Sequence, residues 1–197
     1  MSSTRFNALS ISKKLAMMAF IILLTAPAAL AAQKIRILKM PSANTQGVRT
    51  IQAQLLVDAP TAIVWQAMTD YNDIDDILPG YSRSVILSTT GNTKVLDLAM
   101  KPAPLLPSYR YQVRATEHQN LLTFERIKGD LKYLKARYQL APKNGGQKTL
   151  VTYTLSIDPG SNLPGTNNVL RSHTERSIYA LAAHVETIAK KSLIGQR

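Results

Sequence analysis

The chain has 197 residues, of which 45% are hydrophobic and 18% are charged. This length fits one domain with additional segments, and the hydrophobic content is too high for a chain that is disordered throughout. Cysteine is absent, which excludes disulfides, thiolate nucleophiles, cysteine-based metal sites and lipidation at a cysteine. The formal net charge of +12 favours an anionic partner, either an acidic lipid surface, nucleic acid or an acidic protein.

Residues 1–31 have the pattern of a secretory signal peptide. A basic start precedes an almost wholly apolar run over residues 15–24, and Pro27 breaks that run. Ala29-Leu30-Ala31 is the small-x-small pattern of a cleavage site, so we expect cleavage at its end or one residue later. The alternative is an uncleaved anchor, although the apolar run is short for a membrane span. A cleaved chain would be periplasmic or secreted, where the positive charge would not meet nucleic acid.

The mature chain begins with a basic and irregular segment, residues 32–47, which we interpret as a linker or a loosely attached first strand. Residues 48–57 alternate apolar and polar side chains, which predicts a half-buried strand. Two short helices follow, over residues 62–68 and 70–78, with Asp70 in position to cap the second.

Acidic residues gather around the start of this second helix, at Asp70, Asp73, Asp75 and Asp76. They lack the regular spacing and the closing glutamate of a calcium-binding loop. We therefore interpret them as caps and a solvated helix face, which acidic residues favour at helix starts. Because the chain also has no cysteine and no cluster of His and Glu, we predict no metal site and no cofactor.

From residue 81 onward the side chains alternate with a period of two, and turns containing Gly or Asn separate the segments. In the first segment, Val85 and Leu87 share one face and Ser84 lies on the other. The predicted strands cover residues 81–89, 93–100, 109–117, 121–128, 131–141 and 148–157. Residues 101–107 interrupt the series, since a segment with three prolines is excluded from a central strand.

A long helix is predicted over residues 163–193, where one stripe of side chains is mainly apolar. The second half of the stripe is aliphatic, whereas the first half contains Asn167 and Thr174. A helix of this length needs a surface on which to bury its stripe, and consecutive strands with short turns form an antiparallel sheet. The sequence therefore predicts an α+β fold: a curved antiparallel sheet of about seven strands wrapped around the last helix, with two short helices after the first strand.

This order of elements, with several local motifs, resembles the START-like superfamily, also called SRPBCC or helix-grip. Its polyketide cyclase and coenzyme Q-binding branch is the most similar part. The motifs that carry the resemblance are Ala59-Pro60, Val64-Trp65, Thr69-Asp70-Tyr71, Leu78-Pro79-Gly80, Gly129-Asp130 with Tyr138, Leu140 and Pro142, and Asp158-Pro159-Gly160 with Leu163-Pro164. The resemblance assigns residues 48–193 to one START-like domain and implies a hydrophobic cavity between sheet and helix.

The chain departs from this branch at a few positions. The branch often has Trp where Tyr138 stands and Gly where Ala136 stands, and neither the proline-rich segment 101–107 nor a signal peptide is general to it. These departures weigh against a role specific to ubiquinone. The ligand implied by the resemblance is a lipid, an isoprenoid, a polyketide or a similar hydrophobic molecule.

Sheet tyrosines and the more polar half of the last helix are the expected walls of this cavity, because polar groups are poorly tolerated in a dry core. The predicted ligand-pocket residues are Tyr109, Tyr111, Tyr138, Tyr153, Leu155, Leu170, His173, Thr174 and Ser177. Asn167 is expected to border the cavity as well, and the plain core is expected at Ile178, Leu181, Val185 and Ile188.

A pocket rim is predicted at Pro104, Leu105 and Leu106, where an apolar pair between prolines suits a lid or a membrane contact. The alternative is a rigid connection between strands. Lys101 and Arg110 nearby would assist peripheral contact with an anionic membrane. The basic hairpin that includes Lys132, Lys135 and Arg137 is either membrane-facing or simply solvated.

No arrangement in the sequence identifies a catalytic nucleophile, since there is no G-x-S-x-G elbow and no cysteine. We therefore expect an exported carrier of a hydrophobic small molecule, and assign no catalytic residue. One alternative is a cyclase or aromatase using the same pocket, with His173 or a buried tyrosine as its acid or base. Another is a protein-interaction module that uses the basic surface. The oligomeric state stays open.

Overall fold

The computed structural model describes residues 36–43, 47–104, 106–160 and 164–194, with side chains omitted for residues 36–43 and 192–194. Its elements are β1 (Arg36–Ala43), β2 (Arg49–Val57), α1 (Thr61–Thr69), the 3₁₀ helix η1 (Tyr71–Asp73), α2 (Ile74–Ile77), β3 (Tyr81–Thr90), β4 (Thr93–Met100), β5 (Tyr109–His118), β6 (Leu121–Gly129), β7 (Tyr133–Lys143), the 3₁₀ helix η2 (Asn144–Gly146), β8 (Lys148–Asp158) and α3 (Thr166–Ile194). The signal-peptide prediction for residues 1–31 lies outside the described residues.

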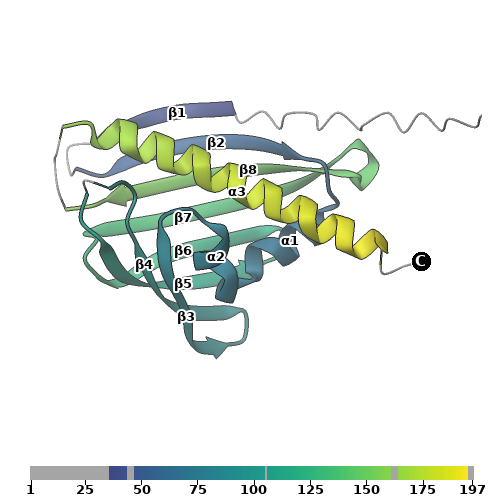
Figure 1. Ribbon diagram of the computed structural model, residues 1–197, viewed down its shortest axis with the longest axis horizontal. Coiled ribbons are helices and arrows are strands. Elements are labelled where there is room, and N and C mark those ends of the chain that lie inside the picture. The colour runs from purple at the N-terminus through teal and green to yellow at the C-terminus, as the bar shows by residue number, and fades with distance from the viewer. Residues whose placement is uncertain (1–35, 44–46, 105, 161–163, 195–197) are drawn as a thin grey trace, which may run out of the picture. The chain divides into compact units, whose positions relative to one another are not determined.

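The strands form one antiparallel sheet in the order β1-β2-β8-β7-β6-β5-β4-β3. Figure 1 shows α3 crossing one face of this sheet, with α1 and α2 on the same side. The predicted α+β helix-grip architecture is confirmed, including the two short helices after the strand β2.

The sheet has one strand more than the predicted seven. The additional strand, β1, lies within residues 32–47, the segment interpreted as a linker or a loosely attached first strand, and it pairs with the outer edge of β2. Its register against β2 shifts twice, between Ile37 and Lys39 and again between Lys39 and Ser42. Such shifts, and Pro41 within the strand, remove the regular period of two by which strands are found in a sequence.

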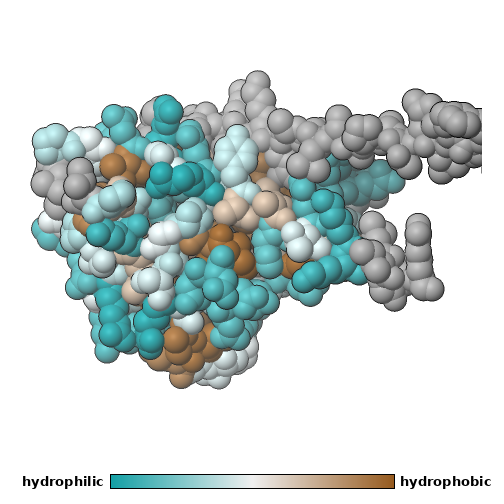
Figure 2. All heavy atoms as spheres, in the orientation of Figure 1, coloured by the Kyte–Doolittle hydropathy of each residue, from teal (hydrophilic) through white to brown (hydrophobic). Residues whose placement is uncertain are grey.

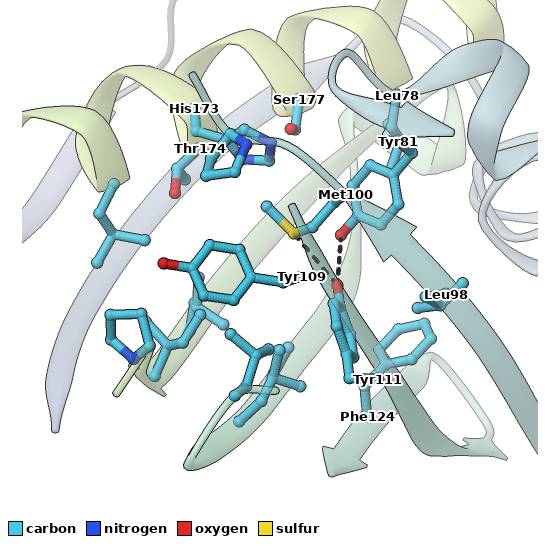
Figure 3. Close-up of a pocket in the computed structure, with 18 of the residues that line it drawn as sticks. Leu78, Tyr81, Leu98, Met100, Tyr109, Tyr111, Phe124, His173, Thr174 and Ser177 are labelled. Carbon is cyan, nitrogen blue, oxygen red and sulfur yellow. Dashed lines mark hydrogen bonds between the residues drawn. The ribbon is translucent and has the colours of Figure 1, made fainter. Parts of the chain in front are cut away.

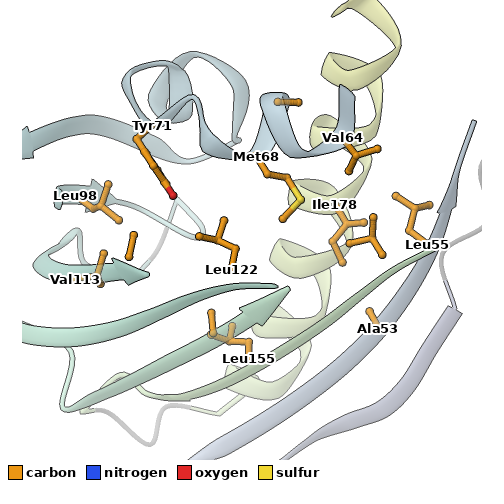
Figure 4. Packing of buried hydrophobic residues seen from close by; sticks show 14 of the residues in the cluster. Ala53, Leu55, Val64, Met68, Tyr71, Leu98, Val113, Leu122, Leu155 and Ile178 are labelled. Carbon is orange, nitrogen blue, oxygen red and sulfur yellow. The ribbon is translucent and has the colours of Figure 1, made fainter. Parts of the chain in front are cut away.

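Of the four residues of the last helix predicted as plain core, Ile178 and Val185 are buried, and Leu181 and Ile188 are partly buried against the core. Val185 is 0% exposed and Ala182 is 3% exposed, and α1 packs against this part of α3. Figure 4 shows Ile178 pointing toward Leu55 and α1, between helix and sheet. Full burial of an aliphatic side chain of this size stabilises the fold by about 1.5–3 kcal/mol, so this contact anchors the helix.

Two local expectations are wrong. In β3, Ser84 is buried and donates a hydrogen bond to the carbonyl of Tyr71, whereas Leu87 is 47% exposed. β3 is an edge strand with two register shifts. Figure 2 shows hydrophobic residues at the bottom of the viewed face, where β3 lies in Figure 1. Asp70 stands at the N-cap position of η1 but makes no capping hydrogen bond through its side chain. The second predicted helix is instead two short pieces, η1 and α2.

A buried carboxylate ties three strands together on the sheet face opposite α3. Asp97, on β4, has a side chain that is 5% exposed. Its carboxylate accepts hydrogen bonds from Arg83 Nε at 2.8 Å and from Arg110 NH2 at 2.7 Å. These hydrogen bonds, first from Arg110 and then from Arg83, lower the pKa of Asp97 to about 2. The cluster holds β3 and β5 against β4, and these strands form one end of the sheet.

We expect Asp97→Asn to lower the free energy of unfolding by about 1–3 kcal/mol at neutral pH, since a neutral amide replaces an acceptor of charged hydrogen bonds. A depressed folded-state pKa contributes stability that is present above pH 4 and lost as the pH falls toward 2. Denaturant unfolding from pH 7 to pH 2.5 should therefore show the gap between wild type and variant narrowing below pH 4. Asp70→Asn, at an exposed residue, is the control, and an equal loss in both variants would contradict the role given to Asp97.

Candidate ligand cavity

A cavity of about 150 Å³ lies between α3 and the sheet. Its walls come from β3 through β8, from the start of β2, from α2 and the loop after it, and from the first half of α3. Figure 3 shows Tyr109, Tyr111 and Phe124 on the sheet side and His173, Thr174 and Ser177 descending from α3 on the other. The lining is predominantly apolar, which is the usual character of a site for a hydrophobic small molecule.

All nine predicted ligand-pocket residues lie on the cavity wall, namely Tyr109, Tyr111, Tyr138, Tyr153, Leu155, Leu170, His173, Thr174 and Ser177. Their contact with a ligand stays a prediction. Among the predicted rim residues, Leu106 lines the cavity, Pro104 is exposed and Leu105 lies outside the described residues. Ile178 belongs to both the core and the cavity wall, whereas Asn167 is exposed at the start of α3.

The structure adds lining residues that the sequence analysis did not select. Leu98, Met100 and Val113 lie on the inner faces of β4 and β5, and Phe124 on that of β6. The alternation of apolar and polar residues along these strands indicated that these side chains share the inner face of the sheet. Tyr81 is harder to find, because it precedes a register shift at the start of an edge strand.

Two of the tyrosine hydroxyls on the sheet side bond to each other. Tyr81 and Tyr111 are paired through their hydroxyl oxygens at 3.3 Å, and Tyr111 also donates to Met100 Sδ at 3.3 Å. The rings of Tyr138 and Tyr153 pack against each other, with their centroids 4.5 Å apart. Burial raises the pKa of all four phenols, so that they are neutral at physiological pH.

The helix side of the cavity carries polar atoms without partners. His173 Nε2, Thr174 Oγ1 and Ser177 Oγ are buried and make no hydrogen bond to the described part of the chain. Burial and the nearby charge of Arg176 lower the pKa of His173, while the Pro79 backbone has the opposite, smaller effect. The imidazole is therefore neutral at pH 7, when it serves as a hydrogen-bond donor at one nitrogen and an acceptor at the other.

Two loops meet above His173. The amide of Lys101 donates to the Gly80 carbonyl at 2.7 Å, and Arg176 NH2 on α3 donates to the Pro102 carbonyl at 3.0 Å. Gly80 has a φ of +86°, and a Cβ atom there would lie 2.6 Å from the Lys101 carbonyl oxygen. Glycine at this position is thus required for the close approach of the loop after α2 to the segment before β5.

Among the described residues, Arg49 is the cationic side chain on the cavity wall, and it is 7% exposed. Its Nε donates to Asn167 Oδ1 at 3.0 Å and its NH1 to the Gly47 carbonyl at 3.2 Å. These bonds fasten the start of β2 to the start of α3. The guanidinium is thereby held at one end of the cavity.

No group of three or more metal-ligating side chains occurs in the described residues.

Sequence comparison matches residues 57–183 to the family described as polyketide cyclase / dehydrase and lipid transport. The chain belongs to this family. The match covers more than half of the chain and includes most of the cavity wall. A search of curated protein sequences finds no significant match.

Solved structures of the START-like superfamily share the fold. An aromatase/cyclase, Zhui, from Streptomyces sp. R1128 has a TM-score of 0.61 at 16% identity, with 74% of this chain and 96% of that chain covered. A START superfamily protein from Mycobacterium smegmatis has a TM-score of 0.62 at 16% identity, with 71% and 98% covered. A STAR-related lipid transfer protein from Xanthomonas axonopodis has a TM-score of 0.57 at 16% identity, with 74% and 97% covered. The superfamily predicted from the sequence is confirmed.

The buried neutral histidine gives stability a pH dependence of known sign. Its folded-state pKa lies below the usual value of 6.5, so the unfolded chain binds more protons as the pH falls below that value. We expect the free energy of unfolding to decrease between pH 7 and pH 5, and to decrease less in His173→Gln.

Thermal or urea unfolding at several pH values measures this difference. His118→Gln is the matched control, because His118 is exposed at the end of β5 and should leave the wild-type slope unchanged. Equal slopes in wild type and His173→Gln would show that His173 is not buried as described.

Proposed function

We propose that the mature protein binds and carries a hydrophobic small molecule, a lipid, isoprenoid or polyketide-like compound, in the cavity between sheet and α3. The observation that carries this proposal is the apolar cavity walled by Tyr109, Tyr111 and Leu155 on the sheet side. Transfer of a ligand's apolar surface from water into such a space is worth about 25 cal/mol per Å². The family description, which includes lipid transport, supports the same function.

Binding without chemistry is supported by the state of the cavity's polar groups. The four phenols have raised pKa values, so none of them is a phenolate that could accept a proton at neutral pH. A nucleophile oriented by a base is absent from the cavity's described residues. The walls thus have the features of a container, with aromatic rings for shape and neutral hydroxyls.

We further propose that the carrier works outside the cytoplasm, in a periplasm or as a secreted protein. Residues 1–31 supply the support for this, through their signal-peptide pattern. Among the described residues no helix has the length and hydropathy to span a bilayer. Peripheral contact with an anionic membrane is supported by Lys101, which is exposed at the start of the segment 101–107, whereas Arg110 is paired with Asp97.

A cyclase-type activity is the second candidate, and His173 is the observation that favours it. It is a buried, neutral imidazole facing an apolar cavity, which suits a general acid or base. The family description includes polyketide cyclases, and one structural neighbour is an aromatase/cyclase. In an assay that detects turnover of a polyketide, His173→Ala should lower kcat by at least about a hundredfold if the imidazole transfers the proton.

Filling the cavity tests the carrier function. Ala136 is 7% exposed and lines the cavity, so Ala136→Leu should occupy part of its volume and weaken ligand binding at least tenfold. We expect the melting temperature to stay level or rise, because added apolar volume in an empty space restores contacts. Protein purified from its own host is analysed by native mass spectrometry for bound molecules and then for uptake from vesicles.

The matched control is Ala183→Leu, at an exposed position of α3. It adds the same side chain away from the cavity and should retain wild-type binding. A wild-type protein that carries no apolar molecule and takes none from vesicles would contradict the carrier function. Equal loss of binding in both variants would contradict the assignment of this cavity as the site.

A further inference from the structure

The two sides of the cavity differ in how their polar atoms are satisfied. On the sheet side, the hydroxyls of Tyr81 and Tyr111 bond to each other. On the helix side, three buried polar atoms have no partner in the described part of the chain. Among the described residues of the cavity wall, the buried polar atoms without a partner therefore all lie on α3.

These three atoms belong to one short stretch of α3. His173 and Ser177 are four residues apart and share a helix face, and Thr174 adjoins them. His173 is 9% exposed and Thr174 is 3% exposed, and Figure 3 shows all three side chains on the cavity side of the helix. A buried polar group without a partner lowers the stability of the folded chain, and three together are unusual in an element that anchors the fold.

A ligand removes this cost if it brings its own hydrogen-bonding group. On the basis of the proposed carrier function, we propose that His173, Thr174 and Ser177 form a recognition site for an uncharged oxygen group of the ligand, a hydroxyl or phenol. The apolar body of the same molecule then lies against Tyr109 and Tyr111. The ligand is thus amphipathic, with its polar end directed at α3 and not at the sheet.

The donors and acceptors of the three side chains match such a group. A hydroxyl both donates and accepts, which suits a neutral imidazole beside two aliphatic hydroxyls. A carboxylate would need a cation, and the nearby arginines are engaged elsewhere: Arg49 with Asn167 and Gly47, and Arg176 with Pro102. The site therefore favours an alcohol or phenol over the corresponding acid.

Two small molecules of equal shape test the site, since apolar cavities of about 150 Å³ in other proteins hold a single aromatic ring. The probes are p-xylene and p-cresol, which differ by a methyl and a hydroxyl group. Their dissociation constants are measured by NMR titration on the purified protein and on the double variant Thr174→Val, Ser177→Ala. We expect the preference for p-cresol over p-xylene to fall about five- to tenfold in the variant, because the variant lacks two side-chain hydroxyls that would bond to the cresol hydroxyl. The hydration of each free probe is the same for both proteins, so it cancels in this comparison.

Thr187→Val is the matched control, since Thr187 is exposed on α3 and donates to the Ala183 carbonyl at 3.1 Å. It should keep the wild-type preference. Unfolding curves establish that each variant is folded, and Ser177→Ala alone replaces the double variant if that one is unstable.

The possible results separate this inference from the carrier function. An unchanged preference in the variant, with both probes bound, overturns the polar site and leaves the carrier function intact. Stronger binding of 4-methylbenzoate than of p-cresol overturns the assignment to an uncharged group. Binding of none of the probes to the wild type counts against the carrier function itself, and the inference falls with it.

Discussion

Burial of the apolar stripe of α3 is the constraint on which the structure depends. A helix over Thr166–Ile194 cannot shield such a stripe alone, and the sheet supplies the surface. Contact is tight only along the second half of the helix, where Val185 and Ala182 are buried against the sheet and α1. The first half faces the cavity, so the same helix is an anchor at one end and a wall at the other.

The cavity's chemistry follows from this division. The sheet contributes aromatic side chains from neighbouring strands, and Tyr81 and Tyr111 bond to each other through their hydroxyls. On α3, Thr174 and Ser177 make no hydrogen bond to the described part of the chain, whereas Thr187 on the same helix donates to the Ala183 carbonyl. The buried polar atoms of the cavity wall that lack a partner therefore lie on the helix, and they give an occupant with a hydrogen-bonding group a preferred orientation.

Much of this could be predicted from the sequence, for identifiable reasons. Period-two alternation located the strands from residue 81 to residue 158, and the change from aliphatic to polar residues along the last helix located its cavity half. The segment that contains β1 was left open between a linker and a loosely attached first strand, because two register shifts and Pro41 hide its period. The orientation of β3 was wrong because an edge strand with shifts in register exposes Leu87 and buries Ser84. The contact between Gly80 and Lys101 depends on two loops that only the tertiary fold brings together.

The position of β1 has a consequence for handling the protein. With β1 in place, one side of β2 forms hydrogen bonds with β1 and the other with β8. A chain shortened to begin at residue 48 would leave the backbone groups of β2 open along Arg49–Gln54, the residues that pair with β1. Open edges of this kind pair with edges of other molecules, which leads to aggregation or strand exchange. The basic segment 32–47, which contains β1, thus covers the edge of β2, and we expect the protein to be less soluble without it.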